Sequence, residues 1–122
     1  MNYKLNYSQW GKQEISAINK VVKSGYLTMG KNVYTFEKQF AKYLGRKYAV
    51  MVNSGSSANL LSLASLFYKK KKPLKVNDEV IVPAIAWSTT YSPLQQYGLK
   101  IKIVDISLKD LNADIDKILS SI

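Results

Sequence analysis

The stretch with the clearest chemical potential is Asn53-Ser54-Gly55-Ser56-Ser57-Ala58-Asn59, which lies between an apolar run and an apolar helix-forming segment. Small residues let the backbone approach a ligand closely, and the first N–H groups of a helix, here those of Ser56, Ser57 and Ala58, have no partner within the helix. Together with the hydroxyls of Ser56 and Ser57, these groups predict a phosphate site. The alternative is that Ser54 or Ser56 only caps the helix. The stretch is neither a Walker A loop nor a GxGxxG motif, because the required glycines and lysine are missing.

A second candidate is the polar turn Ala84-Ile85-Ala86-Trp87-Ser88-Thr89-Thr90-Tyr91, which follows a predicted strand. Ligands in open parallel α/β sheets gather at the carboxyl ends of the strands. The indole of Trp87 could lie flat on a planar heteroaromatic ring, although a partly buried packing role is the alternative. Because both turns follow predicted parallel strands, we expect Gly55 to Ala58 and Ala86 to Thr90 to face one pocket. That pair of turns suits a planar cofactor that carries a phosphate.

The composition limits what other chemistry is available. The 122 residues fit one domain, and the absence of cysteine and histidine excludes disulfides, a thiol nucleophile, the usual zinc sites and an imidazole base. No metal site is predicted. The net charge of +10 comes from 17 lysines and only one arginine, Arg46, whereas nucleic-acid readout favours arginine, so no nucleic-acid partner is expected. The run Lys69 to Lys72 is predicted to be a solvated helix end or loop, with a polyanion site as the alternative.

The elements that must position these residues alternate in type, which predicts an α/β fold with a parallel sheet and right-handed crossovers. Helical spacing and the placement of Gly25 and Gly45 predict two N-terminal helices. The helix after Ser57 is apolar nearly all round, so we expect it to lie deep in a larger structure. The predicted elements are helices at 12–24 and 33–44, a strand at 48–52, a helix at 58–68, a strand at 78–83, a helix at about 90–98 with Pro93 in its first turn, a strand at 101–106, and a short helix capped by Asn112 or Asp114.

No apolar run approaches the roughly 20 residues that span a bilayer, and the N-terminal MNYKLNYSQW lacks the apolar core of a signal peptide. We therefore expect a cytoplasmic protein without a membrane span.

Six segments, in order and with normal spacings, resemble the N-terminal part of the DegT/DnrJ/StrS family of sugar aminotransferases, which have the fold of aspartate aminotransferase (fold type I). The resemblance covers most of the chain. The segments are Gly30-Lys31-Asn32-Val33, Phe36 to Ala41, Lys47 to Val50, Asn53 to Ala58, Asn77 to Pro83, and Gly98 followed by Val104-Asp105-Ile106.

The resemblance implies roles for individual residues. Ser56 and Ser57 match the positions that hold the phosphate of pyridoxal phosphate, Gly55 gives the close turn, and Trp87 matches the aromatic residue that stacks on the pyridine ring. The loop from Tyr26 to Gly30 corresponds to the substrate-entrance loop near the nucleotide sugar. It also implies that residues 1–45 form an N-terminal helical segment carrying that loop, and residues 46–122 the first part of a truncated cofactor-binding α/β domain.

Within the family, Ser56 to Leu60 and Trp87 to Gly98 resemble the branch of CDP-4-keto-6-deoxyglucose 3-dehydrases. That branch uses pyridoxamine phosphate and has a histidine where the aminotransferases have the lysine that bonds the cofactor. Neither this position nor the aspartate that pairs with the pyridine nitrogen falls within the 122 residues, so no catalytic residue is assigned to this chain.

The resemblance thus implies the N-terminal part of an enzyme of deoxysugar biosynthesis, as in lipopolysaccharide and O-antigen, acting on a nucleotide sugar as a homodimer. The 3-dehydratase branch would add an iron–sulfur reductase partner. The alternatives are a nucleotide-sugar aminotransferase that uses pyridoxal phosphate and a truncated module without catalysis. The fragment alone is expected to be inactive.

Overall fold

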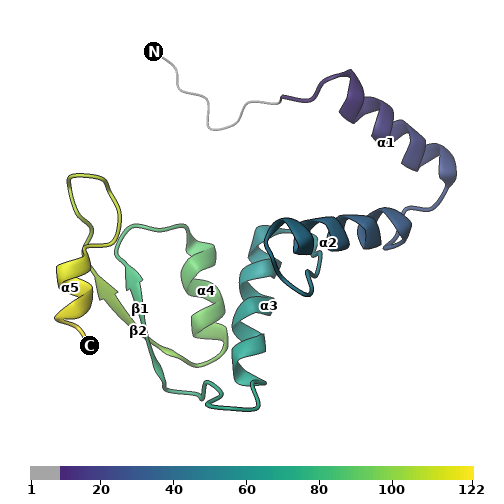
Figure 1. Ribbon diagram of the computed structural model, residues 1–122. Helices are drawn as coiled ribbons and strands as arrows, with labels where there is room; N and C mark the ends of the chain where they lie inside the picture. Colours follow the sequence, from purple (N-terminus) through teal and green to yellow (C-terminus); the bar gives the residue numbers. More distant parts are fainter. Residues whose placement is uncertain (1–8) are drawn as a thin grey trace. The chain divides into compact units, whose positions relative to one another are not determined.

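The computed structural model describes residues 9–122, which contain five helices and two strands (Figure 1). The expectation of no signal peptide rests on residues 1–10, and residues 1–8 lie outside the described part of the chain. The described residues form two compact units, divided between Met51 and Val52. In order, the elements are α1 (Lys12–Ser24), α2 (Lys31–Tyr43), α3 (Gly55–Phe67), β1 (Glu79–Pro83), α4 (Ser88–Gln96), β2 (Lys100–Val104) and α5 (Ile115–Leu119).

The first unit contains α1 and α2, and both predicted helices are confirmed. Gly25 ends α1 in the left-handed conformation, with φ of 68°. Gly45 does the same after α2, with φ of 62°; its N–H bonds to the Lys42 carbonyl while that of Arg46 bonds to the Ala41 carbonyl. This pair of bonds is a Schellman motif, which explains why a glycine is needed there.

The strand predicted at 48–52 is not formed, and these residues have no regular secondary structure. A strand exists only through hydrogen bonds to a neighbouring strand. Within the described residues the only sheet is the pair β1–β2. The N–H of Met51 donates instead to Oε1 of Glu37, at 2.8 Å. Of the three predicted strands, the second and third are formed and the first is not.

The second unit is built around the parallel pair β1–β2, with a register that runs from Glu79 opposite Lys100 to Pro83 opposite Val104. Helix α4 connects the two strands and packs against both of them and against α3 (Figure 1). Four side chains, Leu63, Val82, Leu94 and Leu99, form the buried core. The predicted α/β organisation with parallel strands is confirmed.

Two helices of this unit differ from the sequence-based expectation. Only Leu63 of α3 is buried, and Leu61 is 47% exposed, so the described residues cover one face of a helix expected to be enclosed. Helix α4 begins at Ser88, two residues earlier than expected. Pro93 consequently falls in the second turn rather than the first.

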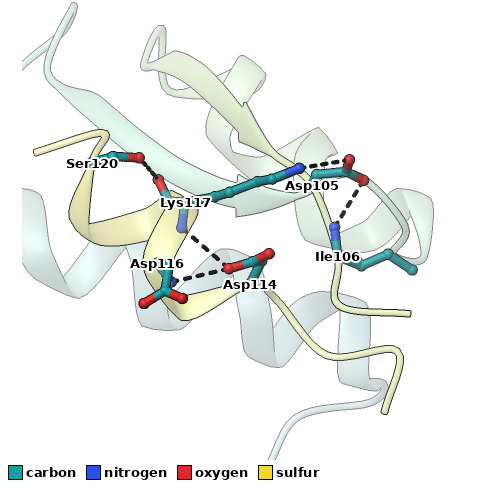
Figure 2. Close-up of polar contacts among 6 residues, drawn as sticks. All are labelled: Asp105, Ile106, Asp114, Asp116, Lys117 and Ser120. Atoms are coloured by element: carbon teal, nitrogen blue, oxygen red, sulfur yellow. Dashed lines mark hydrogen bonds and ion pairs between the residues drawn. The ribbon is translucent and has the colours of Figure 1, made fainter. Parts of the chain in front are cut away.

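Two further bounds differ, because α3 begins at Gly55 rather than Ala58 and β2 ends at Val104 rather than Ile106. Other local predictions agree with the structure. Asp114, one of the two proposed caps, accepts the N–H groups of Asp116 and Lys117 at the start of α5 (Figure 2). The lysine run at 69–72 is an exposed loop. Across residues 9–122, no helix has the length and apolar character needed to cross a membrane.

Candidate functional site

The candidate phosphate site is the N-terminus of α3, where Ser54 is the N-cap residue. Its hydroxyl oxygen accepts the N–H of Ser57 at 3.2 Å, and its O–H donates to the Ser57 hydroxyl oxygen at 3.1 Å. The N–H of Ala58 donates to the Ser54 carbonyl at 3.0 Å. Ser54 is thus a structural cap, which is the alternative role considered for it.

These bonds change which groups are free to meet a ligand. The N–H groups of Ser57 and Ala58, both expected to be free, are used within the turn. Among the described residues, the N–H groups of Gly55 and Ser56 have no protein partner. The hydroxyl of Ser57 accepts from Ser54, so its own proton remains available, and the exposed Ser56 hydroxyl makes no hydrogen bond to residues 9–122.

The local electrostatics favour an anion. The first turn of α3 contains no acidic residue. A helix N-terminus carries about half a positive charge, which attracts phosphate and carboxylate groups. A Cβ atom built at Gly55 would meet nothing within 4 Å, so the backbone there is open to close approach. This end of α3 therefore fits a phosphate group.

The second candidate residue, Trp87, is the N-cap residue of α4 and is 77% exposed. Its carbonyl accepts the N–H of Thr90 at 2.8 Å, which closes the first turn. One turn further, the hydroxyl of Tyr91 donates to the Pro83 carbonyl at 2.7 Å and ties α4 to the end of β1. The first turn of α4 thus fixes the backbone of Trp87, while its indole ring remains largely exposed.

The two turns are brought together, as the sequence predicts. Nδ2 of Asn59 on α3 donates to the carbonyl oxygen of Thr89 on α4, at 3.3 Å. A small cavity of about 160 Å³ lies between the helices; its lining residues are Ser56, Ser57, Leu60, Thr89, Ser92, Pro93 and Gln96. Trp87 lies two residues from Thr89 but does not line this cavity. The hydrogen bond through Asn59 was not foreseen, although an amide within an otherwise apolar helix is the signal that could have revealed it.

The site contains groups that bind but none that transfers a proton. The residues lining the cavity include no carboxylate, lysine or tyrosine. In the described part of the chain, no group of three acidic side chains is placed to hold a metal ion. What this arrangement can do is bind an anion and present an aromatic face.

Comparison with known proteins places this arrangement in a family. Residues 8–122 match the model of the DegT/DnrJ/EryC1/StrS aminotransferase family. The chain belongs to this family. That result confirms the resemblance noted in the sequence.

Individual relatives share more than half of their aligned residues with this chain. The chain is 54% identical over 122 residues to a GDP-4-keto-6-deoxy-D-mannose 3-dehydratase of Yersinia pseudotuberculosis, covering 100% of this chain and 31% of that protein. It is 56% identical over 118 residues to the protein of the same name in Escherichia coli O55:H7, covering 97% of this chain and 30% of that protein. The chain thus spans about a third of the length of these relatives.

Solved structures give the same result. The E. coli GDP-4-keto-6-deoxy-D-mannose-3-dehydratase with bound hydrated pyridoxal phosphate matches 99% of this chain and 31% of its own, with 55% identity and a TM-score of 0.91. The sugar aminotransferase Spr1654 of Streptococcus pneumoniae, in its pyridoxal phosphate form, matches 98% of this chain and 30% of its own, with 26% identity and a TM-score of 0.80. The fold is therefore part of the fold type I architecture, as expected.

Proposed function

We propose that this chain is the N-terminal part of a sugar 3-dehydratase that depends on pyridoxal or pyridoxamine phosphate and acts on a GDP-linked 4-keto-6-deoxy sugar. The observation that carries the proposal is the identity of 54% and 56% to two proteins named for that reaction. The sequence alone suggested a CDP-linked substrate, and these relatives favour GDP instead. A nucleotide-sugar substrate also suits deoxysugar biosynthesis, such as that of lipopolysaccharide.

The residues present fit the cofactor at two points. The N–H groups of Gly55 and Ser56 and the hydroxyls of Ser56 and Ser57 would hold the phosphate, because they are open donors at a helix N-terminus. The exposed ring of Trp87 would cover a face of the pyridine. When bound, the cofactor supplies an electron sink for chemistry next to the sugar carbonyl. This chain contributes binding and orientation, while the groups that move protons would come from elsewhere in the enzyme.

A nucleotide-sugar aminotransferase is the second candidate. The match to Spr1654 at a TM-score of 0.80 favours it, because that protein shares the fold and is named as a sugar aminotransferase. Its 26% identity is less than half of that to the dehydratases, so the dehydratase is preferred. A homodimer, a cytoplasmic location, an iron–sulfur reductase partner and the entrance role of the Tyr26–Gly30 loop remain predictions.

The product distinguishes the two reactions. The full-length protein, supplied with pyridoxamine phosphate and GDP-4-keto-6-deoxymannose, should release a sugar that lacks the C3 hydroxyl, identified by mass spectrometry and NMR. A product that keeps this hydroxyl and carries an amine at C4 would establish the aminotransferase instead. If neither product forms, with or without an added iron–sulfur reductase and its electron donor, both assignments are contradicted.

Cofactor binding is tested separately from turnover. Replacing both Ser56 and Ser57 by Ala should weaken pyridoxamine phosphate binding about tenfold or more, since hydrogen bonds to charged groups are lost. Ser65→Ala is the matched control, because its hydroxyl donates to the Ser62 carbonyl within α3, away from the site. Equal affinities in the two variants would show that the phosphate lies elsewhere.

A further inference from the structure

The Thr89 carbonyl is a hydrogen-bond acceptor that its own helix does not use in the usual way. In an α-helix this oxygen would accept the N–H of the residue four positions later, but that residue is Pro93, which has none. Nδ2 of Asn59 lies 3.3 Å from the oxygen and donates to it. A bond missing within α4 is thereby replaced by a bond to α3.

This contact is the one side-chain hydrogen bond that joins α3 to α4 among residues 9–122. The rest of their contact includes Leu63 and Leu94 of the apolar core. Apolar packing holds two helices at a given separation but is non-directional, so it specifies their sliding and rotation weakly. A hydrogen bond between one amide and one carbonyl restricts both, because it requires a particular distance and direction.

The position of the bond relates it to the candidate site. Asn59 lies three residues after Ser56, on the same helix, and Thr89 lies two residues after Trp87. Helix α4 is also joined to strand β1, because the hydroxyl of Tyr91 donates to the Pro83 carbonyl at the end of that strand. The Tyr91 bond does not involve α3, and the bond from Asn59 is the one that joins α4 to α3.

We propose that Asn59 is a positioning residue for the cofactor. Through the Thr89 carbonyl it sets the place of Trp87 relative to the phosphate donors at the start of α3. Pro93 has a part in this arrangement, because it leaves the carbonyl without its helical donor. The inference rests on the proposed function, since the spacing matters only if one ligand contacts both helix ends.

The test uses the full-length protein with the variants Asn59→Leu and Asn59→Gln. Leucine has nearly the same size without a donor and, unlike aspartate, adds no charge beside the phosphate. Asn59→Leu should weaken pyridoxal phosphate binding about two- to tenfold, the range of one lost hydrogen bond. Asn59→Gln keeps an amide donor and should recover most of the affinity. Ser62→Ala, three residues further along α3, is the control and should bind normally. If Asn59→Leu does not fold, Asn59→Ala takes its place.

A second readout separates positioning from stability. The emission of Trp87, isolated as the difference between each protein and its Trp87→Phe version, is measured with saturating pyridoxal phosphate. A displaced indole changes the quenching at saturation, whereas a less stable but correctly arranged site does not. Quenching that changes in Asn59→Leu and returns in Asn59→Gln supports the proposal.

Two results would overturn it in different ways. If Asn59→Leu lowers thermal stability while affinity and quenching stay unchanged, Asn59 has only a structural role and the proposed function is unaffected. If the unmodified full-length protein binds no pyridoxal or pyridoxamine phosphate, the proposed function fails and this inference fails with it.

Discussion

At Gly55, the fold and the proposed phosphate ligand differ in whether they require a glycine. It lies outside the left-handed region of backbone conformation, and a Cβ there would meet nothing within 4 Å. The folded chain itself therefore does not require a glycine at this position. A phosphate held by the N–H groups of Gly55 and Ser56 would require one, because its oxygens must come close to the backbone.

We therefore predict that Gly55→Ala changes the free energy of unfolding of the full-length protein by no more than about 0.5 kcal/mol. The same variant should weaken pyridoxamine phosphate binding about tenfold, since the methyl group keeps the phosphate from its donors. Chemical denaturation and equilibrium dialysis measure the two effects. Loss of stability without loss of affinity would contradict the assignment of Gly55.

Gly98→Ala is the matched control with the opposite expectation. Gly98 has φ of +67°, and a Cβ there would lie 3.0 Å from Cγ1 of Val76. Alanine in the left-handed conformation costs about 1–2 kcal/mol, and the short contact adds to it. The variant should lose stability and keep the cofactor affinity of its folded fraction.

Among the elements, α5 is a short helix with a capping carboxylate and an exposed ion pair to Asp105. Asp114 caps it, and Nζ of Lys117 lies 3.0 Å from Oδ2 of Asp105 (Figure 2). The hydrogen bond from Lys117, with that from the Ile106 N–H and the positive charge of Lys117, lowers the pKa of Asp105 below its usual 3.8. A carboxylate with a depressed folded pKa stabilises the fold above its unfolded pKa.

This stabilisation should disappear as the pH falls from about 4 through the lowered pKa of Asp105. Lys117→Met removes the charge and the donor while keeping a long side chain. In this variant, thermal unfolding should depend less steeply on pH in that interval than in the unmodified protein. Lys109→Met, on the exposed loop before α5, is the control and should retain the full dependence. Identical slopes in all three proteins would mean that the ion pair has no measurable effect, as many exposed pairs do not.

The elements also show what the sequence could and could not predict. Helices α1 and α2 were predicted well because Gly25 and Gly45 mark their ends through local backbone geometry. The start of α4 was misplaced, because proline is common in first turns, whereas Pro93 lies in the second turn of α4. The prediction of a strand at 48–52 was also wrong. A strand forms only beside a neighbouring strand, and the local sequence pattern does not identify that neighbour.

The candidate site could likewise be predicted only where local sequence determines it. Its residue types and the adjacency of its two turns were predicted, but the adjacency was argued from two parallel strands, and the strand at 48–52 is not formed; the hydrogen bond from Asn59 to the Thr89 carbonyl joins the two turns instead. Which N–H groups remain free could not, since this depends on the side-chain rotamer of Ser54 and its bonds to Ser57. The tie through Asn59 likewise depends on tertiary packing.

At the scale of the whole molecule, apolar side chains remain exposed on both compact units. In the first unit, Phe36 and Phe40 stack with ring centroids 5.4 Å apart and are 48% and 43% exposed. In the second, Leu61 and Leu66 of α3 are 47% and 40% exposed. Large apolar patches on soluble proteins usually mark contact surfaces or cause aggregation.

We predict that the 122-residue chain on its own associates or dissolves poorly despite its net charge of +10. Sedimentation velocity over a range of concentrations should show species larger than a monomer, increasing with concentration. Leu61→Lys and Leu66→Lys together should reduce this association if α3 takes part. A clean monomer at the highest concentration would show that the exposed side chains are tolerated.

The chemistry of the isolated chain gives the last prediction. It should show neither dehydratase nor aminotransferase turnover, and none of its 17 lysines should act as a specific covalent partner for pyridoxal phosphate. A lysine that captures an aldehyde efficiently needs a desolvated or otherwise activated amine. No lysine among residues 9–122 is buried, and the cavity between α3 and α4 is lined by none. The phosphate donors at Gly55 to Ser57 need no amine, so reversible binding of the cofactor can persist without covalent capture.

Borohydride treatment of the isolated chain with pyridoxal phosphate, followed by peptide mapping, should therefore give only scattered trace labelling. Stoichiometric labelling of one lysine would mean that the chain carries its own aldehyde-binding residue, which would contradict the proposal that it contributes only binding and orientation.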